Sequence, residues 1–360
     1  MLSFALNRNQ ADDRAPYYPG CLFYDKRRYE DAQRLWELSA QLDANFPTVW
    51  RNLSLVYYNQ CGEPQKARET LERAFALDVA DARVLLELDQ LYKKLGVAPS
   101  ERLEHLRTHE DTMLQRDDLC AEFITSLNLT GRFEEAHTML MQRHFHPWEG
   151  GESKVTKQYI CALLGMARHA LAENRPDEAL PLLHQALIFP HNLGEGKLEG
   201  QKDNDIYYLL GVCLSRMGDE AAAHSAFEKA AEGDSTPAGA MYYNDQPADM
   251  ILYRSLAQQA LGHHNEALKC FHQLVDYGET HLFDEVRIDY FAVSLPELQL
   301  FEEDLTKRNQ LHCRFLIGLG CLGLGETTRA EQELAYVVEN DPAHTGAVWM
   351  THRESKVLID

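Results

Sequence analysis

Apolar positions along the chain recur every three or four residues, the spacing that places side chains on one face of an α-helix. In residues 20–44, Gly20 and Phe23 precede a polar turn, and Tyr29, Ala32 and Trp36 follow it at helical spacing. This order predicts two antiparallel helices that approach closely where the small residues lie. No Asn-Gly or Asp-Gly turn joins alternating apolar runs, as it would in a β-hairpin. The pattern predicts an all-α chain.

The same order returns along the chain, marked by one alanine in each predicted second helix. The marker alanines are Ala32, Ala67, Ala136, Ala179, Ala223, Ala267 and Ala330. Their separations are 35, 69, 43, 44, 44 and 63 residues. We interpret 69 as two units, with a degenerate one over residues 84–109, and the values near 44 as one unit with about ten inserted residues. The separation of 63 is one unit with a longer insertion, so the spacing predicts eight helical hairpins.

This arrangement of small and large residues resembles the tetratricopeptide repeat, which has a period of about 34 residues. The resemblance implies a right-handed superhelical solenoid of about eight hairpins with insertions. We expect N-terminal repeats over 1–143 (about four hairpins, the third degenerate) and a Trp-containing loop over 144–154. Central repeats with inserted loops over 155–277, an insertion over 278–310, and a C-terminal repeat and tail over 311–360 complete the predicted order.

Four longer runs carry a more specific resemblance. They are RAPYYPGCLFYDKRRYEDA, HFHPWEGGE, NLGEGK and DYFAVSLPELQLFEEDL. Together they resemble the C-terminal repeat region of a bacterial family of unknown function, whose longer members carry an N-terminal mutarotase-like β-sandwich domain. Residues 2–6 read as the tail of a preceding second helix. We therefore expect the chain to be the C-terminal portion of a longer polypeptide, with an atypical N-terminal cap as the alternative.

Charge and cysteine spacing narrow the classes of partner and site. The chain has 35 Lys plus Arg against 56 Asp plus Glu, a net charge of −21. This acidity argues against nucleic acid and against anionic membranes, which both require a basic surface. The eight cysteines lack the close pairing of a structural zinc site. Without a signal peptide or an apolar run long enough to span a membrane, we expect a cytoplasmic protein with reduced thiols.

The resemblance places the outward-facing residues of the first helices on a concave groove. The candidates for partner binding there are Tyr17, Tyr24, Arg51, Tyr58, Asn59, Arg168 and Tyr208. Tyrosine offers a wide apolar face with a polar tip, which suits a peptide or a sugar. The alternative is that these tyrosines pack one hairpin on the next. Tyr17 and Cys21 stand where a clamp for a peptide's terminal carboxylate requires Lys and Asn, which argues against chaperone-tail binding.

The first insertion concentrates polar and aromatic side chains around two glycines. His146, Trp148, Glu149 and Glu152, with His144 beside them, predict a ligand pocket in which the Trp stacks on a sugar or peptide. The alternative is a loop whose Trp fills the gap between two hairpins. A metal at the two histidines requires a third ligand that the sequence does not place, so we predict no metal.

The other insertions carry weaker signals. Gly194–Lys197 lacks the first glycine, the hydroxyl residue and the preceding strand of a phosphate-binding loop, which favours an ordinary interhelical loop. In the third insertion an apolar stripe from Asp289 to Phe301 precedes Glu302, Glu303 and Asp304. Acidic residues at the start of a helix interact favourably with the positive end of the helix dipole. We therefore interpret these residues as helix-capping charges rather than as an acid–base pair.

These observations predict a non-catalytic protein- or peptide-binding scaffold that uses the concave groove and needs no cofactor. The alternative is a carbohydrate-binding or accessory region that works with a mutarotase-like sugar domain.

Overall fold

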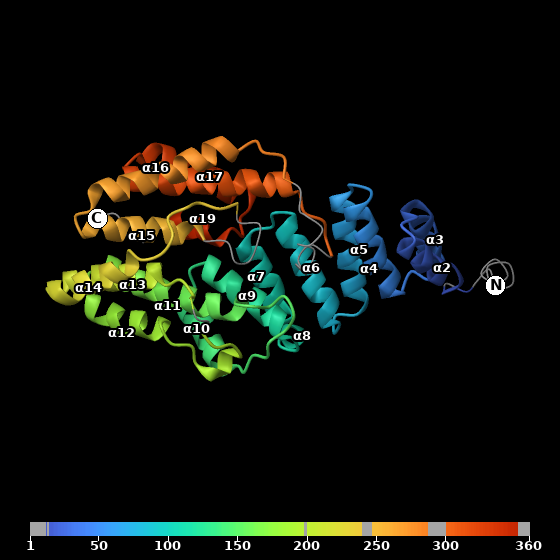
Figure 1. Ribbon diagram of the computed structural model, residues 1–360. Coiled ribbons are helices and arrows are strands. Elements are labelled where there is room, and N and C mark those ends of the chain that lie inside the picture. Colours follow the sequence, from blue (N-terminus) through green and yellow to red (C-terminus); the bar gives the residue numbers. More distant parts are fainter. Residues whose placement is uncertain (1–11, 13, 198–199, 240–246, 287–299, 352–360) are drawn as a thin grey trace. The chain divides into compact units, whose positions relative to one another are not determined.

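The computed structural model describes residues 12, 14–197, 200–239, 247–286 and 300–351, and within these ranges every regular element is a helix (Figure 1). The expectations for residues 2–6 and for the stripe at 289–298 lie outside the described residues. No described helix has the length and the apolar run that crossing a membrane requires. The chain divides into two compact units, each described separately below.

Unit 1 comprises residues Met1–Val97, Glu101–Glu122 and Leu295–Glu303. Its helices pair as successive hairpins, followed by one short helix. They are α2 (Arg14–Asp25) with α3 (Tyr29–Leu42), α4 (Pro47–Asn59) with α5 (Pro64–Leu77), α6 (Ala82–Lys94) with α7 (Pro99–Thr108), and then α8 (Glu110–Met113). Proline in the first turn of α4 and α5 fixes where these helices begin, since its missing N–H lacks a partner there in any case.

Unit 2 comprises Ala98–Ser100, Phe123–Ser294 and Asp304–Asp360, so the boundary falls within α9 (Asp117–Leu129). It continues the hairpin pattern. Its helices are α10 (Phe133–Gln142), α11 (Lys154–Ala172), α12 (Pro176–Ala186), the 3-10 turn η1 (His191–Leu193), α13 (Asn204–Arg216), α14 (Glu220–Ala230), α15 (Ala248–Ala260), α16 (His264–His281), α17 (Leu305–Leu324), α18 (Thr327–Asn340) and α19 (Thr345–Thr351). With α9 and α10 as a pair, the described residues hold eight helix pairs. The predicted all-α helical-repeat fold is confirmed.

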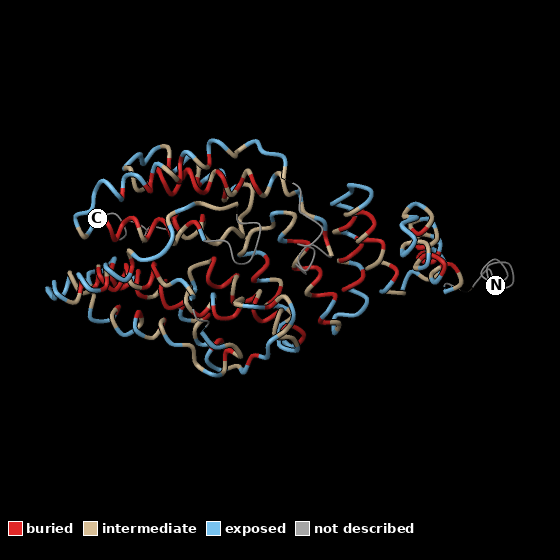
Figure 2. The backbone as a smooth tube through the Cα atoms, viewed as in Figure 1, coloured by how far each residue is buried: buried red, intermediate tan, exposed pale blue. Residues whose placement is uncertain are grey.

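The marker alanines explain why the hairpins close. All seven are buried, and each lies in the second helix of its pair. Glycines in the first helices permit the same close approach: a Cβ added to Gly211 of α13 lies 2.4 Å from the ring of Phe227 on α14. The buried positions accordingly follow the facing sides of paired helices within each unit (Figure 2).

The degenerate third repeat is a real hairpin with an unusual core. Arg102 occupies the place of a marker alanine, because positions 32, 67 and 102 are 35 residues apart. Its side chain is fully buried and binds Asp89 through two hydrogen bonds of 3.0 and 2.5 Å and Glu122 at 3.1 Å. Asp89 stands 35 residues after the buried Ser54. A buried ion pair thus replaces the small-residue contact of the neighbouring hairpins.

Candidate functional site

Equivalent positions at the ends of three first helices form one row across unit 1. Tyr24 is the penultimate residue of α2, Asn59 the last residue of α4, and Lys94 the last residue of α6. Successive members are 35 residues apart, the local repeat length. Equal positions in stacked repeats lie side by side, so the three side chains line up. We call these three residues, together with Tyr58 next to Asn59 on α4, the α2–α4–α6 row.

A distant segment of the same unit, residues 300–303, lies on this row and is held by its main chain. The Asn59 Nδ2 group donates a hydrogen bond to the Leu300 carbonyl at 2.8 Å. The Glu302 N–H donates one to Asn59 Oδ1, also at 2.8 Å. One carboxamide therefore satisfies an acceptor and a donor on either side of Phe301. This pairing depends on main-chain groups that every residue except proline carries.

Side chains of the segment fill the rest of the row. Phe301 is only 2% exposed and meets Tyr58 edge to face, with ring centroids 5.2 Å apart. Glu303 pairs with Lys94 Nζ at 3.1 Å, and Gln60 donates to Glu302 at 3.3 Å. Burial, together with the Glu303 charge, raises the pKa of Tyr58. The contact therefore combines main-chain pairing, one buried aromatic ring and one ion pair.

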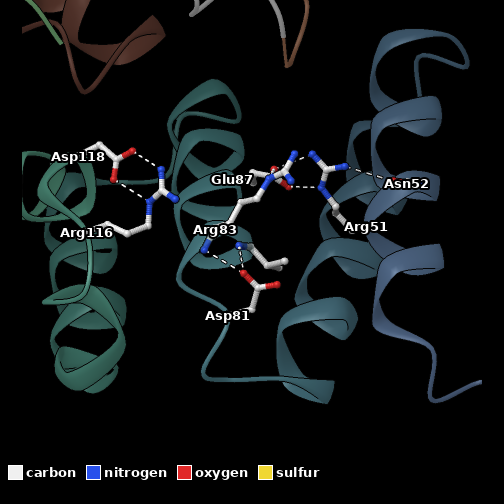
Figure 3. A network of polar contacts seen from close by, with 8 residues as sticks. Arg51, Asn52, Asp81, Arg83, Glu87, Arg116 and Asp118 are labelled. Atoms are coloured by element: carbon white, nitrogen blue, oxygen red, sulfur yellow. Dashed lines mark hydrogen bonds and ion pairs between the residues drawn. The ribbon is translucent and has the colours of Figure 1, made fainter. Parts of the chain in front are cut away.

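A polar network joins α4 to α6 nearer the N-termini of these helices (Figure 3). Arg51 on α4 binds both carboxylate oxygens of Glu87 on α6 at 2.6 Å, and Arg83 reaches Glu87 at 3.0 Å. Arg51 also donates to Asn52, whose side chain donates to the Tyr17 hydroxyl at 3.3 Å. Burial, reinforced by Cys21, raises the pKa of Tyr17 to about 12, so the phenol stays neutral. Arg51 and Tyr17 thus link neighbouring hairpins.

The Tyr24 side chain packs within its own hairpin and is partly exposed to solvent. Its ring lies 5.2 Å from that of Tyr29 and 5.4 Å from that of Trp36, within its own hairpin. Burial, with smaller effects of Tyr29 and Glu302, raises the pKa of its hydroxyl. A hydrogen bond with Asn59 opposes this rise and connects Tyr24 to its neighbour in the row.

In unit 2 the predicted groove residues lie against the chain's own helices. Arg168 on α11 is buried, with its guanidinium 4.8 Å above the ring of Trp349 on α19 and a hydrogen bond to that residue's carbonyl at 3.3 Å. Phe133 meets the same indole edge to face at 5.6 Å. Tyr208 is buried between Phe227 and Tyr253. Tyr208 therefore packs between helices, the alternative expected for the tyrosines, and Arg168 is likewise buried against α19.

Two carboxylates lie at equivalent positions beside this cluster, in the first turns of α13 and α15. Burial, together with the nearby charge of Asp249, raises the pKa of Asp205 to about 7. Burial likewise raises the pKa of Asp249. Burial therefore disfavours the ionised form of both carboxylates, and at Asp205 the charge of Asp249 adds to this effect.

The Trp-containing loop folds on itself and on the second insertion. The Trp148 indole covers Gly151, where an added Cβ would lie 2.2 Å from the ring. Asn192 donates to the Leu140 and Arg143 carbonyls at 2.7 and 2.9 Å, and Glu195 accepts from the Ser153 N–H at 2.9 Å. The remaining predicted side chains are exposed on this loop. They are His144, His146, Glu149 and Glu152.

The structure also describes the glycine-rich run, the acidic residues 302–304 and the cysteines. Lys197 of the Gly-rich run bonds to Asp203 at 2.5 Å, as expected of a structural loop. Asp304 caps α17 by accepting from the Lys307 N–H at 2.9 Å, whereas Glu302 and Glu303 contact the α2–α4–α6 row instead. All eight cysteines are free thiols. Among the described residues, no three His, Cys, Asp or Glu side chains are grouped as a metal site would require.

A family model of the tetratricopeptide repeat matches residues 164–240. This stretch of the chain is similar to the tetratricopeptide repeat. Solved structures similar to this chain include that of the tetratricopeptide repeat protein YrrB, which is described as having an unusual peptide-binding site. The two sequences are 15% identical, the match covers 64% of this chain and 90% of that one, and the TM-score is 0.34. A tetratricopeptide repeat protein from Parabacteroides merdae has 14% identity over 84% of this chain and 98% of that one, with a TM-score of 0.39. Likeness at this level does not extend to what those proteins bind.

Three residues that make the contacts described above were not predicted from the sequence as site residues. Lys94 carries a usable signal, since it follows Asn59 by one repeat length. Phe301 stood out only as part of an apolar stripe, because its contact joins positions more than 200 residues apart. Trp349 lies in the short helix α19, which is not paired with a second helix within the part of the chain that the structure describes.

Proposed function

We propose that this chain is a protein- or peptide-binding scaffold whose binding surface is the α2–α4–α6 row of unit 1. The observation that carries the proposal is the pair of hydrogen bonds from one carboxamide, Asn59, to the main chain of residues 300 and 302. A surface that satisfies a peptide's donor and acceptor together suits an extended peptide. Tetratricopeptide repeats, with their stacked first helices, supply such a surface without catalytic chemistry.

The network around Arg51 supports the proposal by fixing the spacing of the row. Arg51 and Glu87 are both largely buried, and they join α4 to α6 through a bidentate ion pair. A preformed surface binds more tightly than a mobile one, because less ordering accompanies association. We therefore assign Arg51 and Tyr17 to positioning, and Tyr24, Tyr58, Asn59 and Lys94 to contact with the partner.

The finer expectations from the sequence stay predictions. They concern a bacterial origin, a cytoplasmic location, a relationship to the family with a mutarotase-like domain, and the absence of catalysis. No observation favours a carbohydrate over a peptide, since the Trp148 ring covers its own loop at Gly151. Arg168 and Tyr208 are left out of the proposed surface because both are buried.

The test is an unbiased peptide selection. A phage-displayed library of random 12-residue peptides is panned against the full chain, both wild type and Phe301→Ala. Individual clones are then measured on Asn59→Ala and on Asn340→Ala. Asn340 is the matched control, because it is also the last residue of a helix and its side chain donates to the Tyr336 carbonyl one turn earlier in the same helix.

We expect enriched peptides whose binding falls at least tenfold in Asn59→Ala and is unchanged in Asn340→Ala, because two hydrogen bonds are lost. A selection that yields no Asn59-dependent peptide on either chain contradicts the proposal.

A further inference from the structure

Residues 300–303 occupy the α2–α4–α6 row as a bound peptide would. The segment has main-chain pairing on both sides of a buried ring and an acidic side chain paired with a base. We propose that this segment is a built-in ligand, and that the row selects in trans for peptides with an aromatic residue followed by two acidic ones. This inference rests on the proposed function and names its ligand class and its regulation.

The aromatic requirement follows from the burial of Phe301. Its ring is almost fully excluded from solvent and meets Tyr58 edge to face at 5.2 Å. A buried aromatic side chain at the centre of a contact is the usual anchor of a protein interface. A peptide with a small residue at this position leaves the space beside Tyr58 unfilled. We therefore expect the aromatic position to dominate selection.

The acidic requirement follows from the residues that flank the ring. Lys94 ends α6 and pairs with Glu303 at 3.1 Å, with both side chains about one-quarter exposed. Gln60 donates to Glu302 at 3.3 Å. In a chain with a net charge of −21, general electrostatics repel an acidic peptide. Specific pairing with Lys94 must overcome that repulsion, so a charge reversal at this residue should reverse the preference at the matching peptide position.

Occupation by the chain's own segment lowers the apparent affinity for any outside peptide. A tethered ligand acts at a high effective concentration, and binding in trans is weakened by the fraction of sites already filled. Removing the Phe301 ring weakens the internal ligand and leaves the row itself unchanged. The internal segment therefore acts as an autoinhibitory contact, which a partner of the same chemistry displaces.

The test measures binding of a fluorescein-labelled peptide, Leu-Phe-Glu-Glu-Asp with blocked ends, to the full chain by fluorescence polarisation. We expect Phe301→Ala to bind at least tenfold more tightly than wild type. The double variant Glu302→Lys/Glu303→Lys, which leaves the buried ring in place, should also bind more tightly. Adding Asn59→Ala to Phe301→Ala should reverse the gain, and Asn340→Ala should not.

A charge-swap cycle tests the selectivity. Lys94→Glu in the Phe301→Ala background should lose the peptide and should recover binding when the peptide's second Glu is replaced by Lys. Equal binding to all these chains overturns the inference, as does tight binding of a peptide with Ala in place of Phe.

A wild-type dimer that dissociates in Phe301→Ala would assign the bound segment to a second copy and overturn the internal ligand. If the random library yields Asn59-dependent peptides without an aromatic–acidic motif, the proposed function stands and this inference fails.

Discussion

The buried ion pair of the third repeat gives a sharp prediction about stability. Arg102→Ala installs the residue that the neighbouring repeats carry at Ala32 and Ala67, yet it should strongly destabilise unit 1. The Asp89 side chain is 1% exposed and loses the hydrogen bonds at 3.0 and 2.5 Å. Breaking a buried pair by removing one partner costs about 3–5 kcal/mol, because it leaves an uncompensated charge.

The double variant Arg102→Ala/Asp89→Ser should be more stable than the single variant. It restores the small side chain found at Ser54 and removes the stranded carboxylate, leaving chiefly the cost of lost packing. We expect a recovery of about 1–3 kcal/mol, the size of coupling seen between residues in direct contact. Arg116→Ala is the matched control. Its two bonds to Asp118, 2.9 and 2.6 Å long, come from a side chain that is 40% exposed, so its loss should cost less than about 1 kcal/mol.

Hydrogen exchange of α6 and α7, followed by mass spectrometry on the full chain, measures these changes locally. A local readout is needed because a chain with two units has no single free energy of unfolding. A loss of 3 kcal/mol accelerates exchange by about a hundredfold. Exchange in the double variant as fast as in Arg102→Ala, or equal exchange in Arg102→Ala and Arg116→Ala, would refute the reasoning.

Three further predictions concern unit 2. Asp205, whose pKa burial raises to about 7, binds its proton more tightly in the folded state, so stability should fall as pH rises from about 4 to about 7. Thermal melts of Asp205→Asn should lack this component of the pH dependence, and identical profiles for both chains would contradict the assignment. Gly211→Ala drives a Cβ into the Phe227 ring and should cost about 1–3 kcal/mol, measured as faster hydrogen exchange in α13, whereas Gly196→Ala, with open space around it, should be neutral. Trp349→Ala should cost about 1–3 kcal/mol, because the indole is partly buried, and should speed hydrogen exchange in α11; unchanged exchange would show that the indole contributes little.

The repeat pattern predicts the hairpins because close helix packing leaves little choice of residue. Marker positions such as Ala67 and Ala223 must be small where two helices meet, and that requirement is visible at a fixed spacing. The third repeat looked degenerate because Arg102 breaks the pattern. The hairpin still forms, since Asp89 supplies the counter-charge within the same unit. Arg102 in place of alanine and Asp89 in place of a small residue compensate for each other, and neither substitution alone indicates in the sequence that the hairpin forms.

The candidate site was predictable only in part. Tyr58 and Asn59 follow from the face that first helices present, but their contact with Phe301 depends on long-range folding that no local pattern encodes. The Trp148 loop shows the opposite case. Its composition suits a binding site, whereas the backbone turn at Gly151 brings the indole over the loop itself.

The most direct test of peptide binding through Asn59 uses a change in the peptide main chain. Titration of Phe301→Ala with the Leu-Phe-Glu-Glu-Asp peptide is compared with titration by an analogue N-methylated at its first Glu. Methylation there removes the N–H that donates to Asn59 Oδ1 at 2.8 Å. The control analogue is N-methylated at Leu, whose carbonyl rather than N–H contacts Asn59. We predict that methylation at Glu abolishes binding and that methylation at Leu does not. Equal binding of both analogues would contradict the account.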